Sequence, residues 1–341
     1  MRRLRARHHV PPVAAVGLVL LCAAPALSAP PDREIGGSQE GGEVAAHAAA
    51  EEVAFDESGN GSGGRLTTTA RNWSPPPCWY APRWTPGELR VTAETGWTAD
   101  GQSGHAAAAI GWMWNHYDGG DPYTDFNAEE ADEGMWWGAV ENPSEPDVLE
   151  RMSCTEIPFW AETGVVPDVE NALSPSVLAE LAYERIRVPE TEVSFSPADL
   201  DGQVVNLPTW IWAESGEYDP VAVTASLESW GISATTTATP TALTVEPGTA
   251  DAETRPASGS CPINGDGSIG APYGGDEDAV PPCGLTYLRA THGGGNYPLT
   301  ASITWSITWE GTGDTGGTLP DATFATTHEV QVNEIQSVVR P

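Results

Sequence analysis

The sequence contains no lysine, and cations of any kind are few. Fifteen basic residues, all of them Arg, stand against 48 Asp and Glu, which gives a formal net charge of −33 over 341 residues. A surface this acidic repels phosphate groups, so nucleic acids and anionic lipids are poor partners. Hydrophobic residues still make up 40% of the chain, enough for true cores. The length suggests about two domains.

Catalytic and cofactor-binding motifs are also missing. The sequence has no GxSxG nucleophile turn, no P-loop, no HExxH zinc motif, no CxxC pair and no GxGxxG preceded by a predicted strand. Carboxylates are so abundant that the sequence gives no particular pair a reason to act as acid and base. We therefore assign no catalytic residue and expect no cofactor.

No hydrophobic run is long enough to cross a membrane. The longest, Val13–Ala24, follows four Arg and precedes the small residues Ala26–Ser28. This pattern is typical of a cleaved signal peptide at residues 1–28, so we expect a secreted protein that begins at Ala29 or Pro30. An uncleaved anchor is the alternative, which the short run and the prolines after it disfavour. Cleavage removes four Arg and changes the net charge from −33 to −37.

Export would place the cysteines in an oxidising compartment. Apart from Cys22 in the signal peptide the chain has four, an even number that predicts two disulfides with three possible pairings. The composition changes near residue 200, and each half contains two cysteines. We therefore favour Cys78 with Cys154 and Cys261 with Cys283, and we expect neither a zinc site nor a catalytic thiol.

Two regions precede residue 200. Residues 29–72 are rich in Gly, Ala, Glu and Ser with one aromatic residue, so they bury too little apolar surface to order themselves, and we predict a disordered acidic linker. Residues 73–200 are a Trp-rich α+β region. Helix-start and helix-stop signals there predict helices at 85–96, 105–117 and 174–188.

Residues 201–341 change to a period of two. In Ile303–Trp309, Ile and Trp alternate with Ser and Thr, and Trp210–Trp212 and Val221–Val223 follow the same period. Several such strands separated by Gly, Pro and Asp turns predict an all-β domain, an antiparallel β-sandwich of two sheets.

Two resemblances refine this interpretation. Leu285–Tyr287 with Asn296–Ile303 resembles the last strands of polycystic kidney disease (PKD) domains, which are immunoglobulin-like sandwiches of secreted and surface proteins. Val245–Gly248 stands where those domains carry an acidic Gly-Asp-Gly turn, so no ligand role is implied for that turn. Residues 78–341 are similar to a family of secreted actinobacterial proteins with no established activity. The segments that carry this similarity are Cys78–Tyr80, Gly134–Trp137, Ser174–Tyr183, Val205–Trp210 and Cys261–Cys283.

An acidic cluster in the Trp-rich region is the candidate ligand site. Asp118, Asp121 and Asp125 lie close in sequence to several aromatic residues, as in a sugar cleft, although a solvated acidic loop is the favoured interpretation. Adjacent residues of a strand point to opposite faces, so Trp136 and Trp137 cannot both enter one core. They are therefore candidates for ligand stacking, with burial beneath the Cys78 to Cys154 loop favoured as the alternative.

A second loop has the spacing of a cation site. Asn264, Asp266 and Ser268 place oxygen atoms at alternate positions, as calcium loops do. The sixth position is Ile269 instead of Gly, and the twelfth is Gly275 instead of an acid. We interpret the loop as a turn inside a disulfide-closed segment and predict no metal.

The sequence thus favours a secreted, noncatalytic binding or structural protein, in which an α+β region precedes an immunoglobulin- or PKD-like sandwich. Cell-wall or extracellular polysaccharide, or a protein of the cell envelope, would be its partner. The alternative is an extracellular polysaccharide hydrolase that uses carboxylates of residues 118–133.

The large net negative charge predicts that the stability of the protein depends on salt concentration. Like charges on one surface repel, and salt weakens the repulsion because the screening length falls from about 10 Å at 0.1 M to about 3 Å at 1 M. We expect the melting temperature of the mature protein to rise with sodium chloride, mostly below about 0.5 M. A midpoint that stays flat or falls would contradict this. Sodium sulfate serves as the control, since it strengthens apolar burial in any protein.

Overall fold

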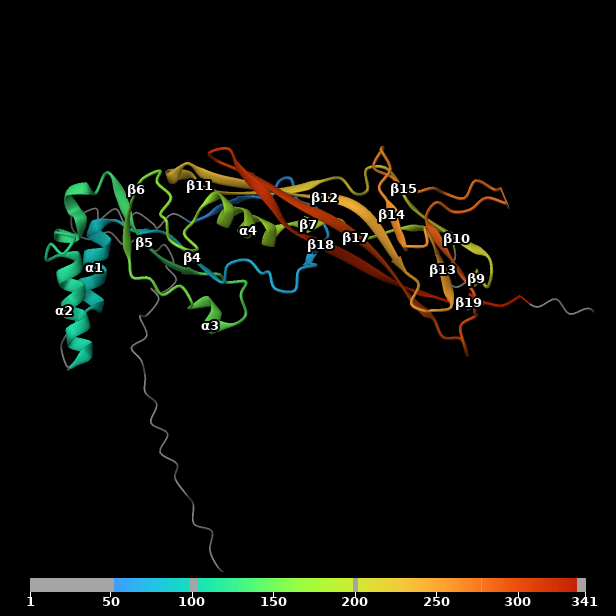
Figure 1. Ribbon diagram of the computed structural model, residues 1–341, viewed down its shortest axis with the longest axis horizontal. Coiled ribbons are helices and arrows are strands. Elements are labelled where there is room, and N and C mark those ends of the chain that lie inside the picture. The colour runs from blue at the N-terminus through green and yellow to red at the C-terminus, as the bar shows by residue number, and fades with distance from the viewer. Residues whose placement is uncertain (1–51, 99–103, 199–201, 277, 336–341) are drawn as a thin grey trace, which may run out of the picture.

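The computed structural model describes residues 52–98, 104–198, 202–276 and 278–335. Strands account for 40% of the described residues and helices for 18%, so the fold is β-rich, with curled antiparallel sheets. The molecule is elongated because three neighbouring strands run along its length (Figure 1). These are β12 (Ile232–Glu246), β17 (Tyr297–Gly311) and β18 (Thr315–Val330). Each extends about 50 Å at 3.3 Å per residue.

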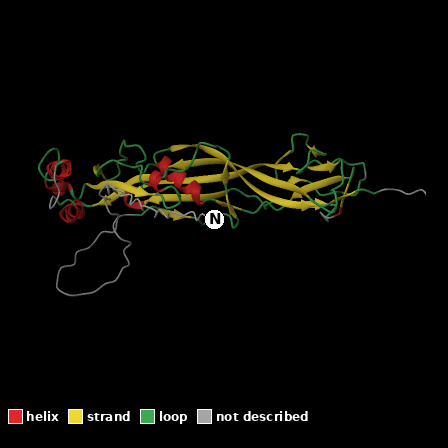
Figure 2. Cartoon of the chain, turned by 90° about the horizontal axis from the view of Figure 1, so that it is seen from below, coloured by secondary structure: helices red, strands yellow, loops and turns green. Residues whose placement is uncertain are grey.

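The three long strands form the centre of a seven-stranded sheet. Its order is β1 (Ala54–Asp56), β11 (Val221–Leu227), β12, β17, β18 and β3 (Thr67–Thr68), and β14 (Ser260–Pro262) pairs with the end of β12. The register shifts after Pro240 of β12 and after Trp305 of β17, two residues that face each other. Such bulges bend strands and increase their twist. The long strands accordingly cross near their middle in Figure 2, and the two halves of the sheet meet different partners.

One half of this sheet is covered by α4 (Pro175–Arg185). The helix starts as predicted, with the Ser174 hydroxyl accepting a hydrogen bond from the Val177 N–H and proline in the first turn. Thr236 of β12 donates its hydroxyl to the Ala179 carbonyl at 2.8 Å. Its same-face neighbours Ala234 and Ala238 are small and buried, which lets the helix approach the strand closely.

The other half shares its core with a five-stranded sheet. That sheet has the order β13 (Ala252–Arg255), β16 (Gly284–Tyr287), β10 (Pro208–Ala213) and β15 (Ile269–Gly270), with β8 (Ser194–Ser196) paired to β10. Ile211 and Leu285 from this sheet lie in one buried cluster with Leu243 and Ile303 from the long strands. Burial of these aliphatic side chains holds the two sheets together.

A three-stranded sheet and two helices form one end of the molecule (Figure 1). The strands are β4 (Cys78–Trp84), β5 (Gly134–Glu141) and β6 (Phe159–Glu162). The predicted helices are confirmed as α1 (Pro86–Gly96) and α2 (His105–Tyr117), followed by the 3-10 turn η1 (Asp125–Glu130). α1 begins with the expected capping box between Thr85 and Glu88.

The remaining elements are short. They are α3 (Val148–Arg151), η3 (Glu228–Trp230), β2 (Gly64–Arg65) with β7 (Arg187–Val188), and β9 (Gln203–Val204) with β19 (Val332–Asn333). Within the described ranges, no helix is long and apolar enough to cross a membrane.

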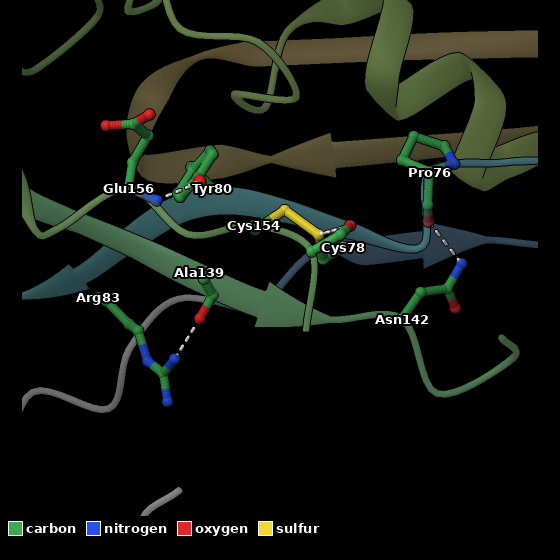
Figure 3. Close-up of a disulfide and its surroundings, with 9 residues drawn as sticks. Pro76, Cys78, Tyr80, Arg83, Ala139, Asn142, Cys154 and Glu156 are labelled. Carbon is green, nitrogen blue, oxygen red and sulfur yellow. Dashed lines mark hydrogen bonds between the residues drawn. A yellow bond between two sulfur atoms is a disulfide. The ribbon is translucent and has the colours of Figure 1, made fainter. Parts of the chain in front are cut away.

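Two disulfides connect distant parts of the chain, with the pairing that the sequence favours. Cys78 at the start of β4 bonds to Cys154, with the Cα atoms 6.0 Å apart (Figure 3), and Cys261 bonds to Cys283 at 5.6 Å. Beside the first, the Glu156 N–H donates to the Tyr80 hydroxyl at 2.8 Å. Two disulfides fit a protein that resides outside the cell.

The structure corrects part of the predicted linker, residues 29–72. Residues 54–68 contribute β1, β2 and β3, which pair with β11, β7 and β18. Phe55 also packs beneath the guanidinium of Arg185, 3.8 Å from its ring centre. Cross-strand pairing orders this segment, and composition alone does not reveal it. The predicted signal peptide and residues 29–51 lie outside the described residues.

The structure also differs from the domain boundary expected at residue 200. α4 belongs to the predicted 73–200 region yet covers a sheet built from residues beyond 201, and β8 pairs with β10 across the boundary. Trp137, Leu178 and Ile303 lie in one hydrophobic cluster. The two predicted regions therefore share a core.

Glu180 on α4 supplies a test of this packing. Burial raises the pKa of its carboxyl above the ordinary 4.5. The ionised form therefore opposes folding at neutral pH, and the opposition disappears once pH falls below 4.5, where folded and unfolded chains are both protonated. We expect Glu180→Gln to raise the melting temperature at neutral pH, with the gain fading as pH falls toward that value.

The matched control is Glu94→Gln, the same change at an exposed position of α1. It removes the same charge without relieving burial. A gain for Glu94→Gln as large as that for Glu180→Gln would show that general charge repulsion, and not burial of Glu180, is responsible.

Candidate binding site

Trp136 and Trp137, the candidate ligand-stacking residues, are both fully buried, so the stacking assignment is wrong and the favoured interpretation, burial, is confirmed. They do point to opposite faces of β5, but each face has a core. Trp137 meets Trp230 in the main cluster at a ring separation of 5.0 Å. Trp136 meets Tyr117 at 5.0 Å in a second, smaller cluster beneath α1 and α2. Neither indole offers a face to a ligand.

The predicted acidic residues Asp118, Asp121 and Asp125 are exposed and lie between the end of α2 and η1. Asp125 forms an ion pair with Arg90 of α1. The Asn115 amide donates to the Asp121 carboxylate at 3.5 Å. The structure thus brings the three acids to one segment, but it separates them from the buried Trp rings with which a sugar cleft was expected.

The backbone of η1 serves packing. Asp125, Phe126 and Asn127 all have left-handed conformations, with φ of 50°, 56° and 64°. Such conformations are costly for residues with side chains. They let the Phe126 ring enter the smaller core while its carbonyl accepts the Trp136 indole N–H at 2.9 Å. Core contacts therefore hold this turn in place.

Several polar atoms of the Asn264–Ser268 loop form hydrogen bonds within the loop. The Asn264 amide donates to the Ser268 hydroxyl at 2.9 Å, and that hydroxyl donates to one Asp266 carboxylate oxygen at 2.7 Å. The Ser268 N–H reaches the same oxygen at 3.1 Å. The hydrogen bonds from Ser268 lower the pKa of Asp266 below its ordinary 3.8. The loop is a rigid turn with an ionised carboxylate, and the described residues contain no cluster of metal-ligand type.

The outer face of β10 carries a pair of aromatic residues. Ile211 points into the core, so Trp210 and Trp212 point outward. The cross-strand neighbours of Trp212 are Gly270 on β15 and Ser194 on β8, both too small to cover an indole. Trp212 is consequently partly exposed, whereas Trp210 is buried and packs against Tyr273 at a ring separation of 5.5 Å.

A pocket of about 260 Å³ opens beside Trp212. Asp266, Ser268 and Pro272 from the disulfide-closed segment form one wall, and Glu214 and Ser215 after β10 form another. Gly270 at its base has φ of 61°, and a Cβ there would lie 2.3 Å from the Ile211 carbonyl oxygen, so only glycine fits. The pocket thus combines an aromatic face, two carboxylates and two hydroxyl groups on a fixed frame.

A larger hollow of about 440 Å³ lies elsewhere, beside β7 and the Glu217 turn. It is lined by Glu190, Glu192 and Glu217, and its aromatic residue, Tyr218, is buried with its hydroxyl donating to the Glu192 carbonyl. That hollow offers carboxylates without an open ring. The Trp212 pocket is therefore the better candidate site.

Comparison with known proteins adds no template for this site. No protein-family model matches the chain, and no curated protein or solved structure matches it. The site is therefore judged from its own geometry and chemistry.

Sequence reasoning did not single out the Trp212 pocket. It placed Trp210 and Trp212 on one face of a strand, and the burial of Ile211 shows that this is the outer face. The informative signal was the pair of small residues, Ser194 and Gly270, that border Trp212. Their strands are distant in sequence, so this neighbourhood is visible only once the sheet is formed.

The internal hydrogen bonding of the Asn264–Ser268 loop generates a prediction. Because Ser268 and one oxygen of Asp266 are already engaged and the loop has one carboxylate, calcium should leave the melting temperature unchanged when ionic strength is matched with sodium chloride. Thermal unfolding with calcium, magnesium or chelator measures this. A rise specific to calcium that Asp266→Ala abolishes would contradict it and establish a cation site.

Proposed function

We propose that the protein is a secreted, noncatalytic binding protein that attaches to polysaccharide outside the cell or in its envelope through the Trp212 pocket. One observation carries this proposal: a partly exposed indole that lines a pocket beside carboxylates and hydroxyls, built on a rigid, disulfide-closed wall. Aromatic faces pack on the apolar faces of rings, and polar groups at the rim bind hydroxyls.

The architecture supports the same proposal. We interpret the two sheets that share Ile211, Leu243 and Ile303 as the predicted immunoglobulin- or PKD-like sandwich. That is also the fold expected from the resemblance to polycystic kidney disease domains. Sandwich folds host many unrelated functions, so the pocket and not the fold supports the binding role.

The alternative, a hydrolase that uses acids of residues 118–133, loses its motivation. Its motivation was an acidic cluster among Trp residues with an exposed ring, and both Trp136 and Trp137 are buried. Asp125 is engaged by Arg90. No second observation on that segment favours catalysis.

The test is cosedimentation of the mature protein with insoluble cell walls, chitin, chitosan and cellulose, with reducing ends assayed in the supernatant. We expect retention on at least one polymer without release of reducing ends. Trp212→Ala should abolish retention, because it removes the indole that lines the pocket. The matched control is Trp112→Ala on α2, whose indole is 52% exposed at the other end of the molecule and should be dispensable (Figure 1).

Two outcomes would reject the proposal. Release of reducing ends would show catalysis. Failure of every polymer to retain the folded wild-type protein would remove the polysaccharide partner.

A further inference from the structure

We infer that the Trp212 pocket recognises the ammonium group of an amino sugar, so that polysaccharide with free amines is the preferred ligand over neutral, N-acetylated or acidic polymers. This inference rests on the proposed function and names the ligand class of the same site. Three features of the pocket support it.

The first feature is charge. Ten residues line the pocket, and among them Asp266 and Glu214 are acidic whereas none is basic. The protein as a whole has a net charge of −33, and a concave site concentrates such a potential. A sugar that carries a carboxylate or sulfate is repelled here, and one that carries an ammonium group is attracted.

The second feature is the indole. The face of Trp binds ammonium groups better than that of Tyr or Phe, because its ring carries the strongest negative potential. Ser194 and Gly270 leave the Trp212 ring partly exposed. An ammonium group can therefore contact the ring while a carboxylate neutralises its charge, and the sugar ring itself packs on the remaining indole surface.

The third feature is preorganisation. The two hydrogen bonds from Ser268 end on one oxygen of Asp266, so the second oxygen is available to a ligand. The Cys261–Cys283 disulfide and the turn at Gly270 fix the wall that carries it. Little ordering entropy is then lost on binding.

The volume of the pocket limits how many sugar rings of a polysaccharide can enter it. A volume of 260 Å³ lies below the range of pockets that enclose drug-sized molecules, about 300 to 1,000 Å³. The pocket accommodates one sugar ring, and the neighbouring rings of a polymer remain outside. Affinity for a single ring is then weak, and attachment gains strength from repeated units of the polymer.

Calorimetry with soluble oligosaccharides of equal length tests the inference. The probes are a glucosamine oligomer, its N-acetylated counterpart and a cello-oligosaccharide, with tetramethylammonium as a bare cation. The measurement is made at about pH 6, below the ordinary pKa of an amine and above that of a carboxyl group. We expect the glucosamine oligomer to bind at least about tenfold more tightly than the other probes, a difference of about 1.4 kcal/mol.

Variants separate the pocket from general charge attraction. Asp266→Asn keeps the acceptor for Ser268 but removes the charge, and Trp212→Ala removes the ring. Each should weaken glucosamine binding about tenfold or more while the melting temperature shows that the protein is folded. Asp118→Asn removes one exposed carboxylate at the other end and should leave affinity unchanged.

Other results would overturn the inference. Equal affinity for the N-acetylated or neutral oligomer would show that the ammonium group is not recognised. Equal affinity for tetramethylammonium would show that the sugar ring is not recognised. Loss of affinity in Asp118→Asn as large as in Asp266→Asn would assign binding to the overall charge. In each case retention on another polymer leaves the proposed function intact, whereas retention on no polymer rejects both.

Discussion

The continuous buried face of β12 and β17 is the constraint on which the rest of the structure depends. Each strand extends about 50 Å, whereas an 11-residue helix such as α4 covers about 16 Å. No single neighbouring element is long enough to cover this face. The helix therefore covers one half of the face, and the five-stranded sheet covers the other half. The aligned bulges after Pro240 and Trp305 make this possible by turning the two halves toward different partners.

Apolar burial and strand pairing, more than charge, hold this acidic protein together. The ion pairs within the described ranges have partly to well-exposed side chains, and exposed pairs contribute little to stability. The excess of carboxylates is therefore a property of the surface. These carboxylates give the Trp212 pocket a negative potential that attracts cations over a distance. The Cys261–Cys283 disulfide and the sheet core hold the pocket rigid.

Short-range sequence patterns are sufficient to predict features that depend on residues close together in the chain. The capping box at Thr85, the Ser174 cap and the even distribution of cysteines predicted helix starts and disulfide pairs that the structure contains. The strands at 54–68 and the joint core across residue 200 depend on partners distant in sequence. The same limit explains why the sequence does not indicate the candidate site. Periodicity places Trp136 and Trp137 on opposite faces, but only the assembled sheets show that both faces are covered and that Trp212 is partly exposed.

The separation of the two clusters at β5 has a consequence for unfolding. Leu89, Tyr117, Phe126 and Trp136 belong to a core of their own, and Trp137 is the adjacent residue in the main core. The helices α1 and α2 can therefore unfold as a cooperative unit while the long sheet remains folded. Amide hydrogens of α1 and α2 then exchange with solvent through this partial opening, and those of β12 and β17 exchange only through global unfolding. The strand β5 marks the border between the two regimes.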